Sequence, residues 1–369
     1  MSPRLPLSLT ILLPLLTFLL TATFCKSRCS NKWQLVDPAW TREAESRRRR
    51  LEEWKSWNVF YHLGGNGPWV ELADELASSA SAEVPDGCAV DQIHLLARHA
   101  ERYPTGPVGK RHLDLLHRIK ETGNELNGSL SFLNHWTYFT SNPSKDFEQL
   151  TTTGPYAGAL EAFSTGIRFR TKYMHLLPAD DSTTTRFWAS DSHRVIQTAE
   201  YFAAGFFGDL DWKIHGKGQL QVIPESFDRG ADTLTPGDTC RLYLQDDLHG
   251  HDNGINVLAR FQEIYTPGIA ERLISSERNH AVGSLSPVEV FAMQEMCAFE
   301  TTVRGGRSGW CNVFTEDDWH HFEYARDLIH YYRAGPGTPY AGAMGWLWLN
   351  ATASLLHRGP SAGPIFLSL

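Results

Sequence analysis

Residues 92–105 of the chain read QIHLLARHAERYPT and join an apolar run to a cluster of charges. The first part, Gln92 to Ala97, is short and mostly apolar, as expected of a strand buried in a covered sheet. Arg98, His99 and Arg102 follow it directly. Open α/β sheets bind their ligands beyond the carboxyl ends of the strands. The stretch therefore predicts a buried strand that delivers two arginines and a histidine to a binding site.

These three side chains suit a phosphoryl group. Arginine forks form strong, directional hydrogen bonds with phosphate oxygens, and two of them can hold one group from two sides. The imidazole of His99 between them can attack phosphorus and form a phosphohistidine while the arginines neutralise the charge. Pro104 then fixes the path of the chain out of the loop. Burying these charges without an anion would be costly, so an ordinary surface loop is the weaker interpretation.

The pattern of the rest of the chain indicates the fold class. Short apolar runs predict strands at residues 185–189 and 222–223, and a helical pattern at 195–206 follows the first of them. Two longer stretches, about 108–180 and 240–330, are mostly helical in pattern. Strands that alternate with helices, together with a long helical portion, predict an α/β fold. We expect a central mixed sheet flanked by helices, with an inserted, mostly α-helical domain.

The N-terminus predicts export from the cytosol. Arg4 precedes an apolar stretch from Leu5 to Phe24, which is typical of a secretory signal peptide at residues 1–24. An uncleaved membrane anchor formed by residues 5–24 is the alternative, because the stretch is nearly long enough to span a bilayer. Pro14 and the modest length favour the signal. Residues 25–56 form a charged N-terminal segment. The expected location is extracellular or in the cell wall, and otherwise on a membrane.

Composition limits the partners. The formal net charge is −8 at pH 7, which argues against a nucleic-acid binder, whereas clustered arginines can still attract a small anion. A membrane contact is expected only if residues 5–24 are an uncleaved anchor, and no pattern indicates an oligomeric state. The sequence holds two N-glycosylation sequons, at Asn127 and Asn350.

The cysteines and histidines predict no metal site. None of the six cysteines forms a Cys-x-x-Cys pair, which argues against a structural zinc site. Cys297 and Cys311 are near enough to close a short loop, whereas Cys88 and Cys240 have no obvious local partner. The adjacent histidines at residues 320–321 point to different faces of a predicted helix and lack the spacing of a zinc protease. The proposed chemistry needs no metal or other cofactor.

At residues 98–105 the sequence resembles the histidine acid phosphatase family, and especially its fungal secreted acid phosphatase and phytase branch. The family pattern is Arg-His-Gly-x-Arg-x-Pro, and Ala100 replaces the glycine. Residues 62–69, 188–195 and 331–337 are also similar to stretches of that branch. The similarity extends from about residue 57 to the C-terminus, so residues 57–369 are identified as a histidine phosphatase domain.

The resemblance implies further residue roles. It makes His99 the nucleophile and Arg98 and Arg102 phosphate ligands, and it places a third phosphate-binding arginine at Arg194. The start of the helix at 195–206 supports this placement, because free backbone N–H groups at a helix N-terminus favour an anion. The family's local disulfide maps onto Cys297 and Cys311.

The resemblance also implies a second motif, a His-Asp pair after a short apolar strand far downstream. Its aspartate protonates the leaving alcohol. The dipeptide His251-Asp252 follows a polar run within the helical part, so we expect a solvated loop there. Residues 363–369 look like the strand that leads into the pair. The proton donor is therefore expected beyond Leu369, the domain is expected to be incomplete at its C-terminus, and the partners of Cys88 and Cys240 are expected in the same absent part.

Three functions compete. The first is an acid phosphatase, possibly a phytase, that hydrolyses a small phosphate monoester through a phosphohistidine. The second is a non-catalytic, truncated remnant that binds phosphate but lacks the His-Asp proton donor. The third is a mutase, against which the predicted secretion argues.

Overall fold

The structure is a computed structural model that describes residues 57–70, 84–177, 185–226, 233–363 and 365–369. The chain divides into two compact units, Met1–Trp57 and Asn58–Leu369, and every described helix and strand belongs to the second. The signal peptide or anchor predicted at residues 1–24 and the charged segment at 25–56 lie outside the described residues. Among the described helices, none is long and apolar enough to cross a membrane.

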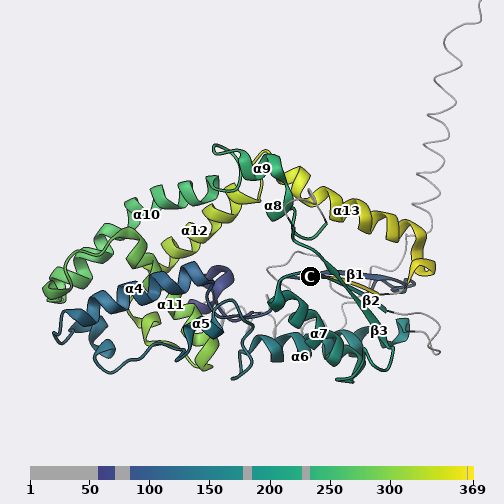
Figure 1. The fold of residues 1–369 in the computed structure, drawn as a ribbon, viewed down its shortest axis with the longest axis horizontal. Coiled ribbons are helices and arrows are strands. Elements are labelled where there is room, and N and C mark those ends of the chain that lie inside the picture. Colours follow the sequence, from purple (N-terminus) through teal and green to yellow (C-terminus); the bar gives the residue numbers. More distant parts are fainter. Residues whose placement is uncertain (1–56, 71–83, 178–184, 227–232, 364) are drawn as a thin grey trace, which may run out of the picture. The chain divides into compact units, whose positions relative to one another are not determined.

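A four-stranded sheet lies at the centre of one part of this unit (Figure 1). Its strands are β1 (Ile93–Leu96), β2 (Thr185–Ser190), β3 (Gly218–Ile223) and β4 (Ile365–Ser368). Their order is β1-β4-β2-β3. The strands predicted at 92–97, 185–189, 222–223 and 363–369 therefore all exist, and the α/β fold class is confirmed.

The direction of the strands is more uniform than the mixed sheet that the sequence predicted. All pairings between the four described strands are parallel. Antiparallel pairing occurs in an isolated bridge between Arg102 and Leu150, just after the sheet edge. Because β4 lies between β1 and β2, the last described strand joins two strands from much earlier in the chain.

One face of the sheet is covered by two helices, α6 (Gly158–Tyr173) and α7 (His193–Phe207). Side chains of β2, β4 and α7 form a buried core between them, with Phe187, Leu367 and Phe206 among its members. The two helices approach closely because glycines face the partner backbone: a Cβ at Gly205 would lie 2.0 Å from a carbonyl oxygen of α6. Apolar burial on this face holds the sheet and places the start of α7 at its edge.

The opposite face carries a row of stacked rings. The centroids of His94 and Phe366 are 4.8 Å apart, and those of Phe366 and Trp188 are 5.6 Å apart. These residues come from β1, β4 and β2, which are neighbours in the sheet. The row therefore ties the three strands whose ends form the site.

The helical part consists mainly of α4 (Gly106–Glu121), α10 (Asn253–Glu271), α11 (Pro287–Arg304) and α12 (Glu316–Arg333). The helix α10 packs on α11 and α12, and α4 packs on α11. The stretch 108–180, predicted from the sequence as one helical part, is divided: α4 packs here, whereas α6 lies under the sheet (Figure 1). A capping box at Ser286 and Glu289 begins α11.

The remaining elements are short, apart from the 18-residue helix α13. They are η1 (Val59–His62), η2 (Gly64–Asn66), η3 (Gly128–Asn134), α5 (Pro143–Asp146), η4 (Met174–Leu176), α8 (Pro236–Thr239), α9 (Arg241–Gln245), η6 (Arg272–Ser276), η7 (His280–Val282), η8 (Gly309–Asn312), α13 (Ala341–Arg358) and η9 (Gly359–Ala362).

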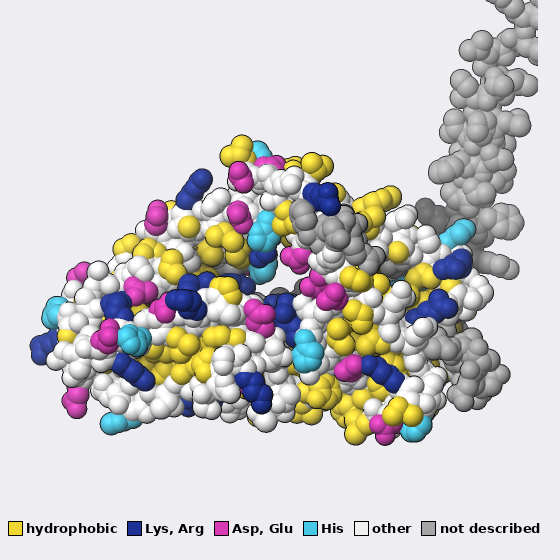
Figure 2. Space-filling model, in the orientation of Figure 1, with side chains coloured by type: hydrophobic (Ala, Val, Ile, Leu, Met, Phe, Trp, Pro, Cys, Tyr) yellow, Lys and Arg dark blue, Asp and Glu magenta, His cyan; other side chains and the backbone are white. Residues whose placement is uncertain are grey.

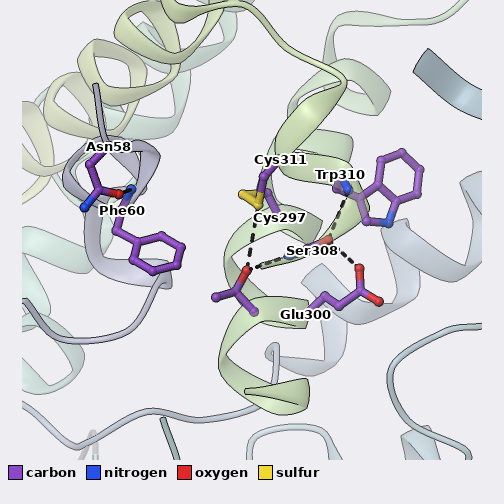
Figure 3. Close-up of a disulfide and its surroundings, with 8 residues drawn as sticks. Asn58, Phe60, Cys297, Glu300, Ser308, Trp310 and Cys311 are labelled. Carbon is purple, nitrogen blue, oxygen red and sulfur yellow. Dashed lines mark hydrogen bonds between the residues drawn. A yellow bond between two sulfur atoms is a disulfide. The ribbon is translucent and has the colours of Figure 1, made fainter. Parts of the chain in front are cut away.

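A disulfide joins Cys297 of α11 to Cys311 of η8 (Figure 3). The turn between them is held by Ser308, whose hydroxyl donates to the buried carboxylate of Glu300 and accepts from the Trp310 amide at 3.1 Å. The two elements are thus fastened covalently and by hydrogen bonds. The other two cysteines in the described part, Cys88 and Cys240, are free thiols.

Candidate active site

The carboxyl ends of β1, β4 and β2 meet at one edge of the sheet because the strands are parallel. The amide of Ala97, which follows β1, donates to Ser368 of β4 at 2.9 Å. Leu369 accepts from Ser190 at the end of β2, also at 2.9 Å. A cavity of about 660 Å³ opens at this edge. In Figure 2 a hollow lies near the middle of the face shown, with arginine or lysine side chains around its rim.

His99 lines this cavity and is held in one orientation. Its Nδ1 donates to the carbonyl oxygen of Ala100 at 2.8 Å, which requires the proton to be on Nδ1. Its Nε2 accepts from Arg102 Nε at 3.3 Å. Burial and the positive charge of Arg98 lower the pKa of His99 from 6.5 to about 3. The ring is therefore neutral over the mildly acidic range, with a lone pair on Nε2.

Arg98 and Arg102 flank the histidine. Arg98 Nη1 donates to the carbonyl oxygen of Gly65 at 2.8 Å, and Arg102 Nη1 donates to that of Tyr103 at 2.8 Å. Burial and the neighbouring Arg98 lower the pKa of Arg102 to about 10, so it stays charged at neutral and acid pH. Each guanidinium has only one end fixed by the backbone, which leaves N–H groups for an anion.

Arg194, the third arginine that the resemblance implies, lies close enough to this pair for its charge to act on both residues, but it is not among the residues that line the cavity. It is the second residue of α7, and its charge lowers the pKa of both His99 and Arg102. Thr198, one turn further along α7, donates to the carbonyl oxygen of Arg194 at 2.7 Å and accepts from the Ala100 amide at 3.1 Å. This link fixes α7 to the loop that carries His99. Among the described residues, the buried Nε of Arg194 has no hydrogen-bond partner.

A carboxylate lies in the same loop. Glu101 lines the cavity, and its Oε1 accepts from the Trp69 amide at 2.7 Å. Burial raises the pKa of Glu101, although this hydrogen bond and the charge of Arg98 act in the opposite direction. No role for Glu101 was predicted from the sequence, because a carboxylate between two arginines has no obvious function in the motif.

Arg326 of α12 was also missed at the level of sequence. Its charge lowers the pKa of Arg98, second only to burial, and its side chain packs where a Cβ of Gly64 would be, 2.9 Å from its Cγ. Its Nη1 lies 4.0 Å from Glu295, a buried carboxylate of α11 that also pairs with Arg111 of α4 at 3.1 Å. The sequence around Arg326 shows only the helical pattern of the stretch 240–330, which does not distinguish a buried arginine from an exposed one.

The dipeptide His251-Asp252 lies elsewhere. Asp252 is the N-cap of α10, and His251 bonds to Asp252 at 2.8 Å and to Arg333 of α12. Neither residue lines the cavity. This placement agrees with a loop role. In the part of the chain that the structure describes, no three His, Cys, Asp or Glu side chains gather in a group that could hold a metal ion.

Comparisons with known proteins identify the family of the chain. The family model for the histidine phosphatase superfamily (branch 2) matches residues 89–364. A phytase of Candida albicans is 32% identical over 85% of the chain, and a constitutive acid phosphatase of Saccharomyces cerevisiae is 32% identical over 82%. The chain spans 65% and 62% of the length of these two relatives.

Solved structures share the fold. The crystal structure of the phytase from D. castellii matches with a TM-score of 0.74 and 28% identity, over 85% of this chain and 66% of that one. A multiple inositol polyphosphate phosphatase of Bifidobacterium longum, in complex with inositol hexasulfate, matches with a TM-score of 0.55 and 13% identity over 83% of this chain and 77% of that one, which supports the fold alone. The resemblance that residues 98–105 indicated is therefore confirmed over most of the domain. The chain belongs to branch 2 of the histidine phosphatase superfamily.

Proposed function

We propose that this protein is a phosphoric monoester hydrolase of the acid phosphatase type, which acts on a small phosphate monoester through a phosphohistidine at His99. The observation that carries the proposal is the state of the imidazole: Nδ1 is fixed by Ala100, so Nε2 is free of a proton. The three arginines Arg98, Arg102 and Arg194 surround it with positive charge. A neutral nucleophile inside a cationic clamp suits attack on a phosphate ester.

The chemistry has two steps. Nε2 of His99 attacks phosphorus, the N–P bond forms, and the P–O bond to the alcohol breaks. The arginines hold the phosphoryl oxygens in both steps. Water then attacks phosphorus, the N–P bond breaks, and phosphate leaves with the neutral imidazole restored. The leaving alkoxide of the first step needs a proton, because an unprotonated alkoxide is a poor leaving group.

The proton donor is proposed to follow Leu369 in a longer form of the protein. The position of β4 supports this, since its carboxyl end lies at the cavity between the ends of β1 and β2. Of the described carboxylates that line the cavity, Glu161 pairs with Arg168 at 2.6 Å, and Glu101 accepts from Trp69 with one oxygen, whereas its other oxygen has no hydrogen-bond partner among the described residues. Without a proton donor in the cavity, the chain would have the second candidate function, that of a phosphate-binding protein without turnover.

Phytate is proposed as one candidate substrate. The relative from Candida albicans is named a phytase, and the solved structure from D. castellii is that of a phytase. Arg326 adds positive charge near Arg98, although it does not itself line the cavity. A substrate with several phosphates would be attracted by this clustered positive charge.

Two substrates with different leaving groups test the proposal. An aryl phosphate such as p-nitrophenyl phosphate needs little protonation, whereas an alkyl phosphate needs a donor. A complete enzyme should hydrolyse both, and a chain with only the nucleophile should hydrolyse mainly the aryl ester.

His99→Ala should abolish both activities and any acid-labile phosphoenzyme, whereas His193→Ala, at an exposed histidine beside Arg194, should retain them. Unchanged turnover in His99→Ala would refute the nucleophile, and phosphate binding without any turnover would favour the second function.

A further inference from the structure

The glycine-rich segment Gly64–Trp69 touches the motif on both sides of His99. Near its start, the carbonyl oxygen of Gly65 accepts from Arg98 Nη1 at 2.8 Å. At its end, the amide of Trp69 donates to Glu101 Oε1 at 2.7 Å. The two contacts come from oppositely charged residues that are three positions apart. The segment therefore forms one wall of the cavity, and its position and that of Arg98 depend on each other.

Glu101 is well placed to hold this wall. Its carbonyl oxygen accepts from both the amide and the hydroxyl of Thr151, each at 3.0 Å. The main chain at Glu101 packs tightly against α6, since a Cβ at Gly158 would lie 2.1 Å from that carbonyl oxygen. The second carboxylate oxygen is buried and has no hydrogen-bond partner among the described residues. Besides its own amide, the Glu101 carboxylate thus bonds to the amide of Trp69, which comes from the glycine-rich segment.

Trp69 is also held through its ring. The guanidinium carbon of Arg168 lies 5.4 Å from the ring centroid, and Arg168 is itself paired with Glu161 at 2.6 Å. Both residues belong to α6. A cation over an aromatic face is attractive, and a carboxylate is a strong acceptor for a backbone N–H. The end of the segment is therefore fastened at the main chain by the motif and at the side chain by α6.

We propose that Glu101 is a positioning residue that fastens the Gly64–Trp69 segment against Arg98 and so fixes the Arg98 guanidinium toward the bound phosphoryl group. Glu101 touches neither the phosphoryl group nor the leaving group in this proposal. It acts through the segment, whose Gly65 carbonyl holds one nitrogen of Arg98 and leaves the others free for phosphate. The inference rests on the proposed function, because it assumes that Arg98 is a phosphate ligand.

The negative charge of Glu101 opposes the binding of an anion, whereas the hydrogen bond between Glu101 and Trp69 favours anion binding. A pair of variants separates the two effects. Glu101→Gln removes the charge but keeps an oxygen that can accept from Trp69. Glu101→Ala removes both. The difference between the two variants therefore reports the loss of the side-chain amide and its hydrogen bond, with the charge absent from both.

The test uses the full chain at neutral pH with sulfate as the probe, since sulfate remains a dianion in the mildly acidic and neutral range. We expect Glu101→Ala to bind sulfate about three- to tenfold more weakly than Glu101→Gln, the effect of one hydrogen bond. We also expect faster hydrogen–deuterium exchange in a peptide covering residues 63–70 of Glu101→Ala only. Equal affinities and equal exchange in the two variants, at equal melting temperatures, would overturn the proposal.

The exchange measurement keeps the two proposals distinct. If the wild-type chain binds no sulfate, the phosphate clamp itself is wrong, and with it the link from Glu101 to phosphate. If the wild-type chain binds sulfate and the exchange of residues 63–70 is the same in both variants, the clamp stands and the role of Glu101 is refuted. Faster exchange together with weaker binding in Glu101→Ala supports both.

Discussion

His99 is kept in its neutral form by its surroundings, which has a consequence for stability. In the folded protein, burial and the charge of Arg98 lower its pKa to about 3 from the ordinary value of 6.5. As the pH falls below 6.5, the unfolded chain takes up a proton at this position and the folded protein does not. Stability therefore falls with decreasing pH between about 6.5 and 3, because the unfolded state binds more protons.

Replacing the histidine should remove this acid sensitivity. We expect the free energy of unfolding of His99→Asn, measured with urea, to exceed that of the wild type by an amount that grows as the pH is lowered from 7 to 4. The same substitution at His357, an exposed residue at the end of α13, serves as the control. A difference for His99→Asn that stays constant with pH would contradict the neutral, buried imidazole.

A substitution at Gly65 tests whether the position of the Arg98 guanidinium matters for anion binding. Its φ of −80° is accessible to any residue, so an alanine here is not strained by its backbone. A Cβ would nevertheless lie 2.6 Å from Arg98 Nη1 and would displace the guanidinium. We expect Gly65→Ala to weaken sulfate binding by on the order of tenfold with little change in melting temperature. Gly342→Ala, where a Cβ meets no atom within 4 Å, is the control. Unchanged affinity in Gly65→Ala would mean that Arg98 does not bind the anion.

The motif residues could be found in the sequence, and the residues that position them could not. His99, Arg98 and Arg102 follow a recognisable strand at a recognisable spacing, and Arg194 follows from the resemblance. Glu101 and Arg326 act through contacts with segments that lie far away in the sequence, such as Trp69 and Gly64. Their roles depend on which surfaces meet, and a single sequence carries no pattern for that.

Among the elements, α11 is the centre of the helical part. Residues 290–302 of this helix are all buried, including the carboxylate of Glu295. Glu295 lies 3.1 Å from Arg111 of α4, 3.7 Å from His112 of α4 and 4.0 Å from Arg326 of α12. Burial raises the pKa of Glu295, but its interactions with His112, Arg111 and Arg326 outweigh that effect and leave the pKa lowered. One negative charge thus ties three helices together.

Glu295→Gln should therefore destabilise the protein strongly. The substitution leaves Arg326 and Arg111 partly buried without their counterion, which in comparable sites costs about 3 kcal/mol. Chemical denaturation would measure the loss. Glu316→Gln, at an exposed position in the first turn of α12, should cost much less. If the two variants were equally stable, the three helices would not depend on this charge.

Helices and strands with a strong local pattern were predicted from the sequence, whereas the elements that they pack or pair with were not. The patterns of β1, β2, β4 and α7 decide both their type and their approximate bounds, whereas only the last two residues of β3 were predicted. The assignment of α6 to the sheet rather than to the helical part depends on the close approach at Gly205, which faces the backbone of Phe163. The parallel direction of all described strands depends on the place of β4 in the sheet, which no local pattern encodes.

At the scale of the whole molecule, secretion remains a proposal. It rests on the N-terminal pattern, the Cys297–Cys311 disulfide and the two sequons, and membrane anchoring by residues 5–24 is the alternative. Asn127 and Asn350 both have exposed side chains in the structure. A sequon asparagine must be accessible to carry a glycan.

We expect protein secreted from a eukaryotic host to lose mass in two steps on treatment with an endoglycosidase. Asn127→Gln and Asn350→Gln should each remove one step, and the double variant should show none. Detection of the protein in the medium would separate secretion from anchoring, since an anchored form would stay with the membrane fraction. A single unglycosylated species in the cells would contradict the predicted export.

The central place of β4 also bears on synthesis at the ribosome. In the described sheet β1 pairs only with β4, and Gln92 before β1 donates to Gly363 before β4, a separation of 271 residues. Contacts between such distant positions form slowly, because a long loop must close first. While the nascent chain is emerging, Arg98 and His99 have no neighbouring strand to fix them beside Arg194. We therefore expect the proposed phosphate site to reach its full geometry after translation has passed residue 368, so that a ribosome-bound chain should retain phosphate more weakly than the released protein.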